Sequence, residues 1–303
     1  MRIKRGSLFA IPDYVFIGIV SALVIFGLVM LTSASSDLGK NRFDDVYYFL
    51  KSQLFPGLFM GVLGFFAGYF IDYRFWKKLA PYLLGFSVLL LLLVFVPGLS
   101  QESYGATRWL NIAGFSIQPG EIAKLGLLIF VSAWLSNKSM KGKGFFEGIA
   151  PMFLWVACVI APIIFQPATT IAVILVLTCL VAYFVSGGSI WHLLLIALVG
   201  LLILGAIIAS SEYRRDRLFS YLNPENDPLG SGYQLNQALI AIGSGGVFGV
   251  GFGESTTKLQ YLPEPIGDSI FAVIAEELGF VGGIFVILLF VFFLFRGFSI
   301  GKK

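Results

Sequence analysis

The sequence is poor in charge, cysteine and histidine. Only 13% of its 303 residues are charged, whereas about a quarter are charged in a typical soluble domain. The single histidine, His192, makes neither a catalytic triad nor a metal cluster. Cys158 and Cys179 both lie in apolar runs, which indicates buried thiols rather than a disulfide framework. No nucleotide-binding loop motif is present, so a pump driven directly by ATP is unsupported.

Long apolar runs dominate the sequence instead, and 57% of the residues are hydrophobic. A bilayer core of about 30 Å needs about 20 apolar residues per helix, and these runs do not alternate apolar with polar residues as strands would. They predict an all-α polytopic membrane protein with about eight transmembrane helices. The expected spans are 14–31, 54–71, 79–96, 120–136, 149–166, 170–186, 190–209 and 272–295.

The distribution of basic residues predicts the orientation. The first apolar run is too long for a signal-peptide core and no small-residue cleavage site ends it, so we expect a retained first span. A cytoplasmic N-terminus places the following basic residues inside, as the positive-inside rule requires: Arg2, Lys4, Arg5, Arg74, Lys77, Lys78, Lys138, Lys141, Lys143, Arg296, Lys302 and Lys303. The net charge of +4 therefore needs no nucleic-acid partner.

This orientation puts a long loop, residues 210–269, outside the membrane between the seventh and eighth spans. Loops of this length are usually functional or disordered, and this one is too rich in apolar and aromatic residues for disorder. Within it, "GYQLNQALIAIGSGG" predicts a short interfacial helix that ends at its glycines.

Charged residues at the predicted outer side are candidates for structural or functional roles. Glu121 and Lys124 share one helix face and form either a structural ion pair or part of a site. Glu276 and Glu277 are expected at the outer interface, where they anchor the start of the last helix. Five further basic residues on this side either anchor lipid headgroups or bind a diphosphate: Arg108, Arg214, Arg215, Arg217 and Lys258.

Four segments together resemble one family. They are "GLVMLTSAS", "GATRWLNIAGFSIQPGEIAKL", "RRDRLFSYLNPENDPLGSGYQLNQALIAIGSGGVFGVGFGES" and "KLQYLPEPIGDSIFAVIAEELGFVGG". The chain resembles the SEDS family (shape, elongation, division and sporulation), and is more similar to its FtsW-type division polymerases than to the RodA-type elongation polymerases. The resemblance implies a peptidoglycan glycosyltransferase that polymerises lipid II on the outer face of the cytoplasmic membrane. It also implies a class B penicillin-binding protein, the transpeptidase, and other division proteins as partners.

The resemblance also implies roles for individual residues. Asp268 inherits the family's catalytic aspartate, Arg108 and Trp109 its Arg-Trp pair, and Glu121 and Lys124 the acid and base of its Gln-Pro-Ser-Glu motif, which reads "QPGE" here.

Our hypothesis makes Asp268 the general base that activates the attacking sugar hydroxyl. Basic groups balance the leaving diphosphate, and the candidates are Arg108, Lys124, Arg214, Arg215, Arg217 and Lys258. Tyr233, Gln237 and Glu264 are weaker candidates for positioning the substrate. No resident cofactor and no metal ligand are assigned, and a divalent cation, Mg²⁺ or Mn²⁺, is left open.

Two features depart from the family. Ala168 stands where the family usually has an aspartate, in "QPATT". If that aspartate only caps the following helix, Thr169 or Thr170 could replace it. The family also has ten spans where this sequence supplies eight, so we expect a single SEDS-type membrane domain over 1–303 that lacks the last two family helices.

Two other classes of function compete with polymerisation. A lipid II flippase would use the same outer cavity, but the predicted spans carry almost no charge below their outer third, which favours chemistry at the surface. A non-catalytic division scaffold is made credible by Ala168.

Overall fold

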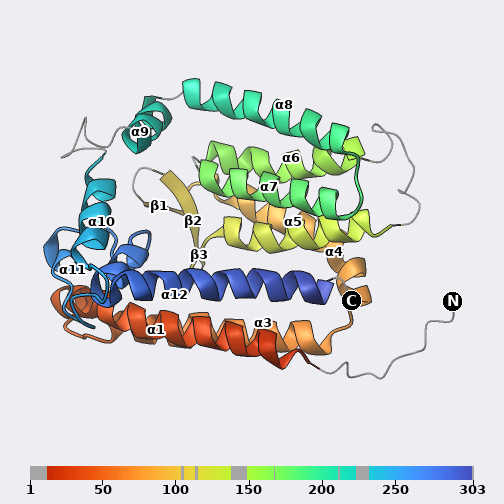
Figure 1. Cartoon of the computed structure of the whole chain (residues 1–303). Coiled ribbons are helices and arrows are strands. Elements are labelled where there is room, and N and C mark those ends of the chain that lie inside the picture. The colour runs from red at the N-terminus through yellow and green to blue at the C-terminus, as the bar shows by residue number, and fades with distance from the viewer. Residues whose placement is uncertain are drawn as a thin grey trace. The chain divides into compact units, whose positions relative to one another are not determined.

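The computed structural model describes residues 12–103, 106–112, 115–137, 149–166, 168–210, 212–222 and 232–301. Helices account for most of this part of the chain, which confirms the predicted all-α membrane fold (Figure 1). The chain divides into two compact units. One joins Met1–Gly64 to Ile208–Lys303, and the other is Phe65–Ile207.

The unit that contains both chain ends is built on two long helices that run side by side, α1 and α12 (Figure 1). Asp13 caps α1 by accepting the N–H of Phe16 at 2.9 Å, and it pairs with Arg296 near the end of α12. Further helices of this unit are shorter, and α3 crosses into the second unit. The bounds are α1 Tyr14–Phe43, α2 Tyr48–Ser52, the π-helical turn η1 Gln53–Leu58, α3 Phe59–Phe70, α9 Glu212–Leu222, α10 Tyr233–Ser244, α11 Thr257–Gln260 and α12 Ile270–Gly301.

Helix α12 is broken at Gly279, where φ is 67° and ψ is −167°. The break frees backbone groups that a continuous helix would pair, and residues 245–251, here called the glycine loop, take them up. The N–H groups of Phe280 and Val281 donate to the carbonyls of Gly246 and Val247, at 2.9 and 3.2 Å. The break therefore costs no unpaired peptide at these positions.

The glycine loop also donates to α12 on the other side of the break. The N–H groups of Val250 and Gly251 bond the carbonyls of Glu276 and Glu277, at 2.9 and 3.1 Å. The approach is so close that a Cβ at Gly249 would lie 2.1 Å from the Glu277 carbonyl oxygen. Only glycine fits there, and the loop is tied by its main chain to α12.

The second unit packs α4, α5, α6 and α7 around one apolar core, with Leu127, Met152 and Val159 fully buried. Its core helices have 16 to 21 residues and are shorter than α1 and α12, which have 30 and 32. The bounds are α4 Tyr73–Leu93, α5 Pro119–Leu135, α6 Ala150–Phe165, α7 Thr169–Val185 and α8 Ile190–Ala209.

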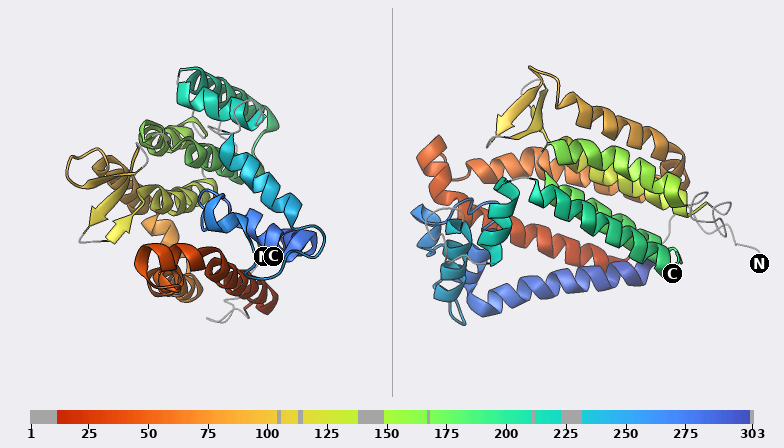
Figure 2. Two further views of the ribbon diagram at one scale, coloured as in Figure 1. Left: turned by 90° about the vertical axis from the view of Figure 1, so that its left-hand side faces the viewer. Right: turned by 90° about the horizontal axis from the view of Figure 1, so that it is seen from above.

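A small antiparallel sheet joins α4 to α5 (Figure 2). Its strands β1 Ser100–Ser103, β2 Ala106–Ile112 and β3 Phe115–Ile117 lie in the order β1-β2-β3. Leu110 is opposite Ser100 on one side and Ile117 on the other. The sequence predicted only a connection between the spans 79–96 and 120–136 here, because strands of three to seven residues are too short to show a clear alternating pattern.

All eight predicted apolar runs are helical, but their ends differ from the prediction. Helix α1 continues to Phe43, and α12 starts at Ile270 and runs to Gly301. Among the described residues, five helical segments are long and apolar enough to cross a membrane, namely α1, Tyr48–Phe70, α4, α8 and α12. The total of eight spans stays a prediction. The predicted short helix is confirmed as α10, with Gly245 as its C-cap residue.

Candidate functional site

Asp268 lies in the turn between α11 and α12, two residues before α12 begins. Its side chain is exposed, and it makes no hydrogen bond or ion pair with the described part of the chain. The turn around it is ordered by its neighbours: Gly267 donates its N–H to the Glu264 carbonyl at 3.0 Å, and Ser269 donates its hydroxyl to the Pro263 carbonyl at 2.9 Å. A fixed turn thus presents an uncommitted, exposed carboxylate two residues before the N-terminus of α12.

Helix α10 reaches this turn through Gln234, whose amide nitrogen lies 3.4 Å from the Ser269 hydroxyl. Two residues of α10 were predicted to bind the substrate, Tyr233 and Gln237. Gln237 lies three residues after Gln234 and therefore on the same helix face. Tyr233 directly precedes Gln234, and the side chains of Tyr233 and Gln237 are both half-buried. Glu264 is exposed and adopts a left-handed conformation with φ of 49°, unusual for a non-glycine residue.

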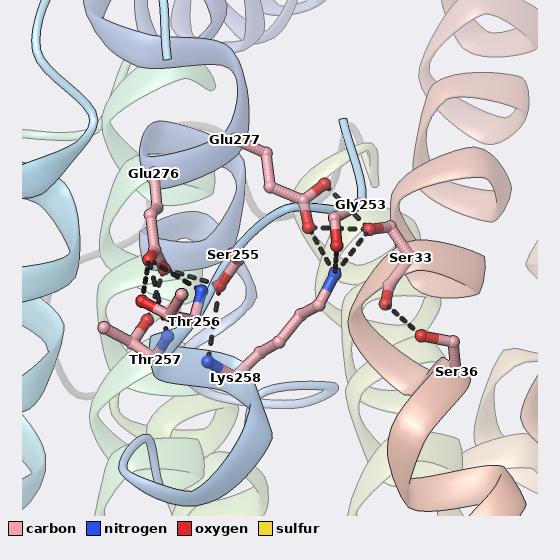
Figure 3. Close-up of polar contacts among 9 residues, drawn as sticks. All are labelled: Ser33, Ser36, Gly253, Ser255, Thr256, Thr257, Lys258, Glu276 and Glu277. Atoms are coloured by element: carbon pink, nitrogen blue, oxygen red, sulfur yellow. Dashed lines mark hydrogen bonds and ion pairs between the residues drawn. The ribbon is translucent and has the colours of Figure 1, made fainter. Parts of the chain in front are cut away.

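Glu276 of α12 is buried and binds the residues at the start of α11 (Figure 3). Its Oε2 accepts the hydroxyl of Ser255 at 2.5 Å and that of Thr257. Its Oε1 accepts the N–H groups of Thr256 and Thr257, at 3.1 and 3.4 Å. Hydrogen bonds from hydroxyl and amide donors thus replace the water that this carboxylate lacks.

Glu277 is equally buried and forms an ion pair with Lys258, at 2.7 Å between Oε1 and Nζ (Figure 3). Ser33 of α1 lies against both residues: its hydroxyl is 2.7 Å from each Glu277 oxygen, and the Lys258 ammonium donates to it at 3.1 Å. A third ammonium bond goes to the Gly253 carbonyl at 2.8 Å. Three segments distant in sequence therefore meet at one buried charge pair.

The predicted place of Glu276 and Glu277 at the start of the last helix is wrong. Both lie inside α12, and each is only 1% exposed. The physical reason is that α12 begins at Ile270, so these carboxylates lie about two turns inside it. Sequence reasoning also gave no role to Ser33, Ser255, Thr256 and Thr257. Two of these residues lie in segments that carry the family resemblance: Ser33 in "GLVMLTSAS" and Ser255 in "GFGES".

In the second unit, Arg108 lies on β2 and donates from Nε to the Gln166 carbonyl at 3.1 Å. Gln166 is buried, and its amide donates to the Leu91 carbonyl at the end of α4 at 3.0 Å. Trp109, the residue after Arg108 on β2, is 36% exposed. The sheet is thus tied to the turn after α6, and it holds the Arg-Trp pair in a fixed place.

The predicted ion pair between Glu121 and Lys124 is confirmed, with 2.7 Å between Oε2 and Nζ. Both side chains are in the first two turns of α5 and remain accessible. The structure therefore leaves both interpretations of this pair open to test, because an accessible pair can also bind a ligand.

Helix α7 starts directly after Ala168, which is its N-cap residue, and no side chain caps the helix. The prediction that Thr169 or Thr170 could replace the missing aspartate as a cap is therefore wrong. Both threonines are the first residues of the helix itself, where they do not precede its free N–H groups.

The remaining predicted residues lie on α9. Arg214 is half-buried and Arg215 is exposed, whereas the Arg217 side chain falls outside the described residues. No three His, Cys, Asp or Glu side chains gather as a metal-ligand set in the described ranges.

The chain matches known proteins over almost its whole length. The family model described as "Cell cycle protein", FtsW/RodA/SpoVE, matches residues 13–303. The stage V sporulation protein E of Bacillus subtilis (strain 168) is 40% identical over 99% of this chain and 81% of its own length. A probable peptidoglycan glycosyltransferase FtsW of Nitrosococcus halophilus (strain Nc4) is 40% identical over 96% of this chain and 75% of its own.

Solved structures share the fold. A chain from a peptidoglycan synthase complex, described for its coordination of polymerisation and crosslinking, has a TM-score of 0.70 at 28% identity and covers 96% of this chain and 78% of its own. The rod-shape-determining protein RodA of Thermus thermophilus has a TM-score of 0.63 at 29% identity, over 97% and 76%. The chain is therefore a multipass membrane protein that belongs to the FtsW/RodA/SpoVE family of cell cycle proteins.

Proposed function

We propose that this protein is a peptidoglycan glycosyltransferase that polymerises lipid II into glycan strands during cell division. The observation that carries the proposal is the exposed Asp268 carboxylate, uncommitted within the described residues, in a chain 40% identical to a probable glycosyltransferase FtsW. The flippase and scaffold alternatives gain no specific support from the described geometry.

Asp268 acts as the general base in this mechanism. Joining two saccharides requires the C4 hydroxyl of one to attack the anomeric carbon of the other while a lipid diphosphate leaves. The hydroxyl is a weak nucleophile, so Asp268 accepts its proton as the new bond forms, an effect worth about a hundredfold to ten-thousandfold. Direct displacement inverts the anomeric centre.

The leaving diphosphate needs positive charge as the bond to the sugar breaks. We assign this role to cationic side chains that remain accessible or half-buried, which are Arg108, Lys124, Arg214 and Arg215. Arg217 stays in this proposal on its sequence position. On their sequence positions, we also assign substrate binding to Trp109, Glu121, Tyr233, Gln237 and Glu264.

The site faces the outside of the cytoplasmic membrane, with the N-terminus inside. The basic residues of the expected cytoplasmic segments support this orientation. Glu254 is exposed and lies three residues before α11. A cysteine introduced there by Glu254→Cys should react with a membrane-impermeant thiol reagent added to intact spheroplasts. Labelling only after lysis would reverse the orientation.

The partner is a class B penicillin-binding protein. The solved complex that shares this fold, described for coordinating polymerisation with crosslinking, supports this assignment. Co-expressed with such a transpeptidase, the chain should copurify with it in detergent, and a failure to copurify from the native membrane would argue against the pairing.

The decisive experiment incubates purified protein, alone and with its transpeptidase, with fluorescent lipid II and resolves the products by length. Wild type should make glycan polymer, and Asp268→Asn should reduce the rate by about a hundredfold or more while keeping side-chain size. Glu254→Gln is the matched control, because it neutralises another exposed carboxylate of the same segment and should leave the rate unchanged.

The other outcomes separate the competing functions. Lipid II movement across vesicle membranes without polymer would indicate the flippase. A folded protein that binds its transpeptidase but neither polymerises nor moves lipid II would indicate the scaffold. In that case Ala168→Asp tests whether the missing carboxylate explains the loss.

A further inference from the structure

We infer that Lys258 is a positioning residue. Its buried ion pair with Glu277, to which Ser33 is hydrogen-bonded, holds the turn that carries Asp268 in place, and we call this arrangement the lock. The inference rests on the proposed function, because it concerns how the general base is held. It also gives Lys258 a role different from the diphosphate binding that its position in the sequence suggested.

The ammonium group of Lys258 has no donor left for a substrate. A lysine ammonium carries three N–H donors, and these meet Glu277 Oε1 at 2.7 Å, the Gly253 carbonyl at 2.8 Å and the Ser33 hydroxyl at 3.1 Å. The side chain is 3% exposed. Binding a diphosphate would require all three bonds and the surrounding packing to be given up.

Glu277, the partner of Lys258, is also committed to contacts within the protein. Its side chain is fully buried, and both carboxylate oxygens are within hydrogen-bond reach of Ser33. The pair is therefore neutral as a unit, and either charge alone would be buried without its partner. The burial of each charge therefore depends on the presence of the other.

The lock closes a loop of chain around Asp268. Lys258 and Glu277 are 19 residues apart, and Asp268 lies between them. A second tie supports the first, because Glu276 binds Ser255 and Thr257 at the start of α11. The segment 261–269 is thus held to α12 by these ties before it and by its continuation into α12 after it, while Asp268 stays exposed.

Position is what a general base needs. A displacement of about 1 Å in a catalytic group can cost on the order of a hundredfold in rate. We therefore expect Lys258→Met to lower kcat on the order of tenfold to a hundredfold, with KM for lipid II within about twofold of wild type. Inhibition by added pyrophosphate should be unchanged, because the diphosphate loses no ligand.

The test is recovery in the double variant Lys258→Met with Glu277→Leu. Removing both charges leaves no unpaired buried ion, and apolar side chains of similar size often replace such a pair without loss. Activity should return at least about tenfold above Lys258→Met if the lysine acts through Glu277. Activity in the double variant that stays as low as in Lys258→Met, or a raised KM with weakened pyrophosphate inhibition, overturns the inference.

Amide hydrogen exchange across residues 261–269 gives a second readout that needs no turnover. Exchange there should be faster in Lys258→Met and return towards wild type in the double variant, whereas equal exchange in all three proteins overturns the lock. Lys51→Met, which breaks the exposed pair with Asp45, is the matched control and should alter neither exchange nor rate. Wild type without polymer would refute the proposed function alone, since the exchange result would still decide the lock.

Discussion

Two lysine–glutamate pairs in this chain have the same length and opposite surroundings. The Nζ to carboxylate distance is 2.7 Å in both, but the Lys258–Glu277 side chains are 3% and 0% exposed, whereas those of Lys124 and Glu121 are 36% and 56% exposed. Water and mobile ions screen the accessible pair and neither reaches the buried one. Distance therefore says little about what an ion pair contributes, and burial decides how much is lost when it is broken.

The largest expected effect comes from breaking the buried pair on one side. Glu277→Gln leaves the Lys258 ammonium buried without its counter-charge, which should cost about 3–5 kcal/mol of stability. Unfolding of the purified protein in detergent, followed by denaturant titration, measures this loss. A change below about 1 kcal/mol, the size typical of an exposed pair, would remove the distinction between the two pairs.

A backbone contact of the same buried region gives the next largest effect. Gly245 has an ordinary helical conformation, but a Cβ there would lie 2.0 Å from the Ala275 carbonyl oxygen of α12, so Gly245→Ala should cost about 1–3 kcal/mol from overpacking.

Gly243 on the same helix provides the matched control. A Cβ there meets nothing within 4 Å, and Gly243→Ala should stabilise the helix by about 0.5–1 kcal/mol. The two alanines should shift the thermal midpoint in opposite directions, and shifts of the same sign would argue against the close approach of α10 to α12.

The exposed pair should respond weakly and in a salt-dependent way. Glu121→Gln is expected to change stability by no more than about 1 kcal/mol, because solvent already screens the partners. Repeating the unfolding at low and high ionic strength sharpens the contrast, since the small difference between wild type and variant should shrink further in high salt. A loss that is large and independent of salt would show that this pair is shielded from solvent.

The smallest effect belongs to the exposed pair after α1, Asp45 with Lys51. The hydrogen bond from Lys51 lowers the pKa of Asp45 below its ordinary value of 3.8, helped by the N–H of Tyr47. A lowered folded-state pKa gives stability that is present above the ordinary value and is lost as the pH falls through the lowered one. In Asp45→Asn, the midpoint of thermal unfolding should therefore fall slightly less than in wild type as the pH is lowered below 3.8. The same dependence of the midpoint on pH in both proteins would contradict the assignment.

The sequence predicted the apolar helices because their signal is local. Hydropathy located all eight runs, and the glycines after "YQLNQALIAI" marked the end of α10. The Glu121–Lys124 pair was predictable for the same reason, since helical spacing alone brings its members together.

The buried network was not predictable because its partners are far apart in the chain. Ser33 and Glu277 are 244 residues apart, and no local pattern links them. Their charge also suggested that Glu276 and Glu277 mark the start of the last helix, whereas their hydrogen-bond partners, which are distant in sequence, let them lie about two turns inside α12. The sheet was missed because its strands are short and its stabilising contact, from Arg108 to Gln166, is again distant in sequence.

The break in α12 bears on the order in which the protein can be made. Peptide groups at Gly279 and after it would be costly in lipid unless something pairs them, and the glycine loop is what pairs Phe280 and Val281. A ribosome completes residues 245–251 before it reaches residue 279. The partner for the broken helix is therefore already synthesised when α12 emerges, and the helix can enter the membrane with its interruption paired.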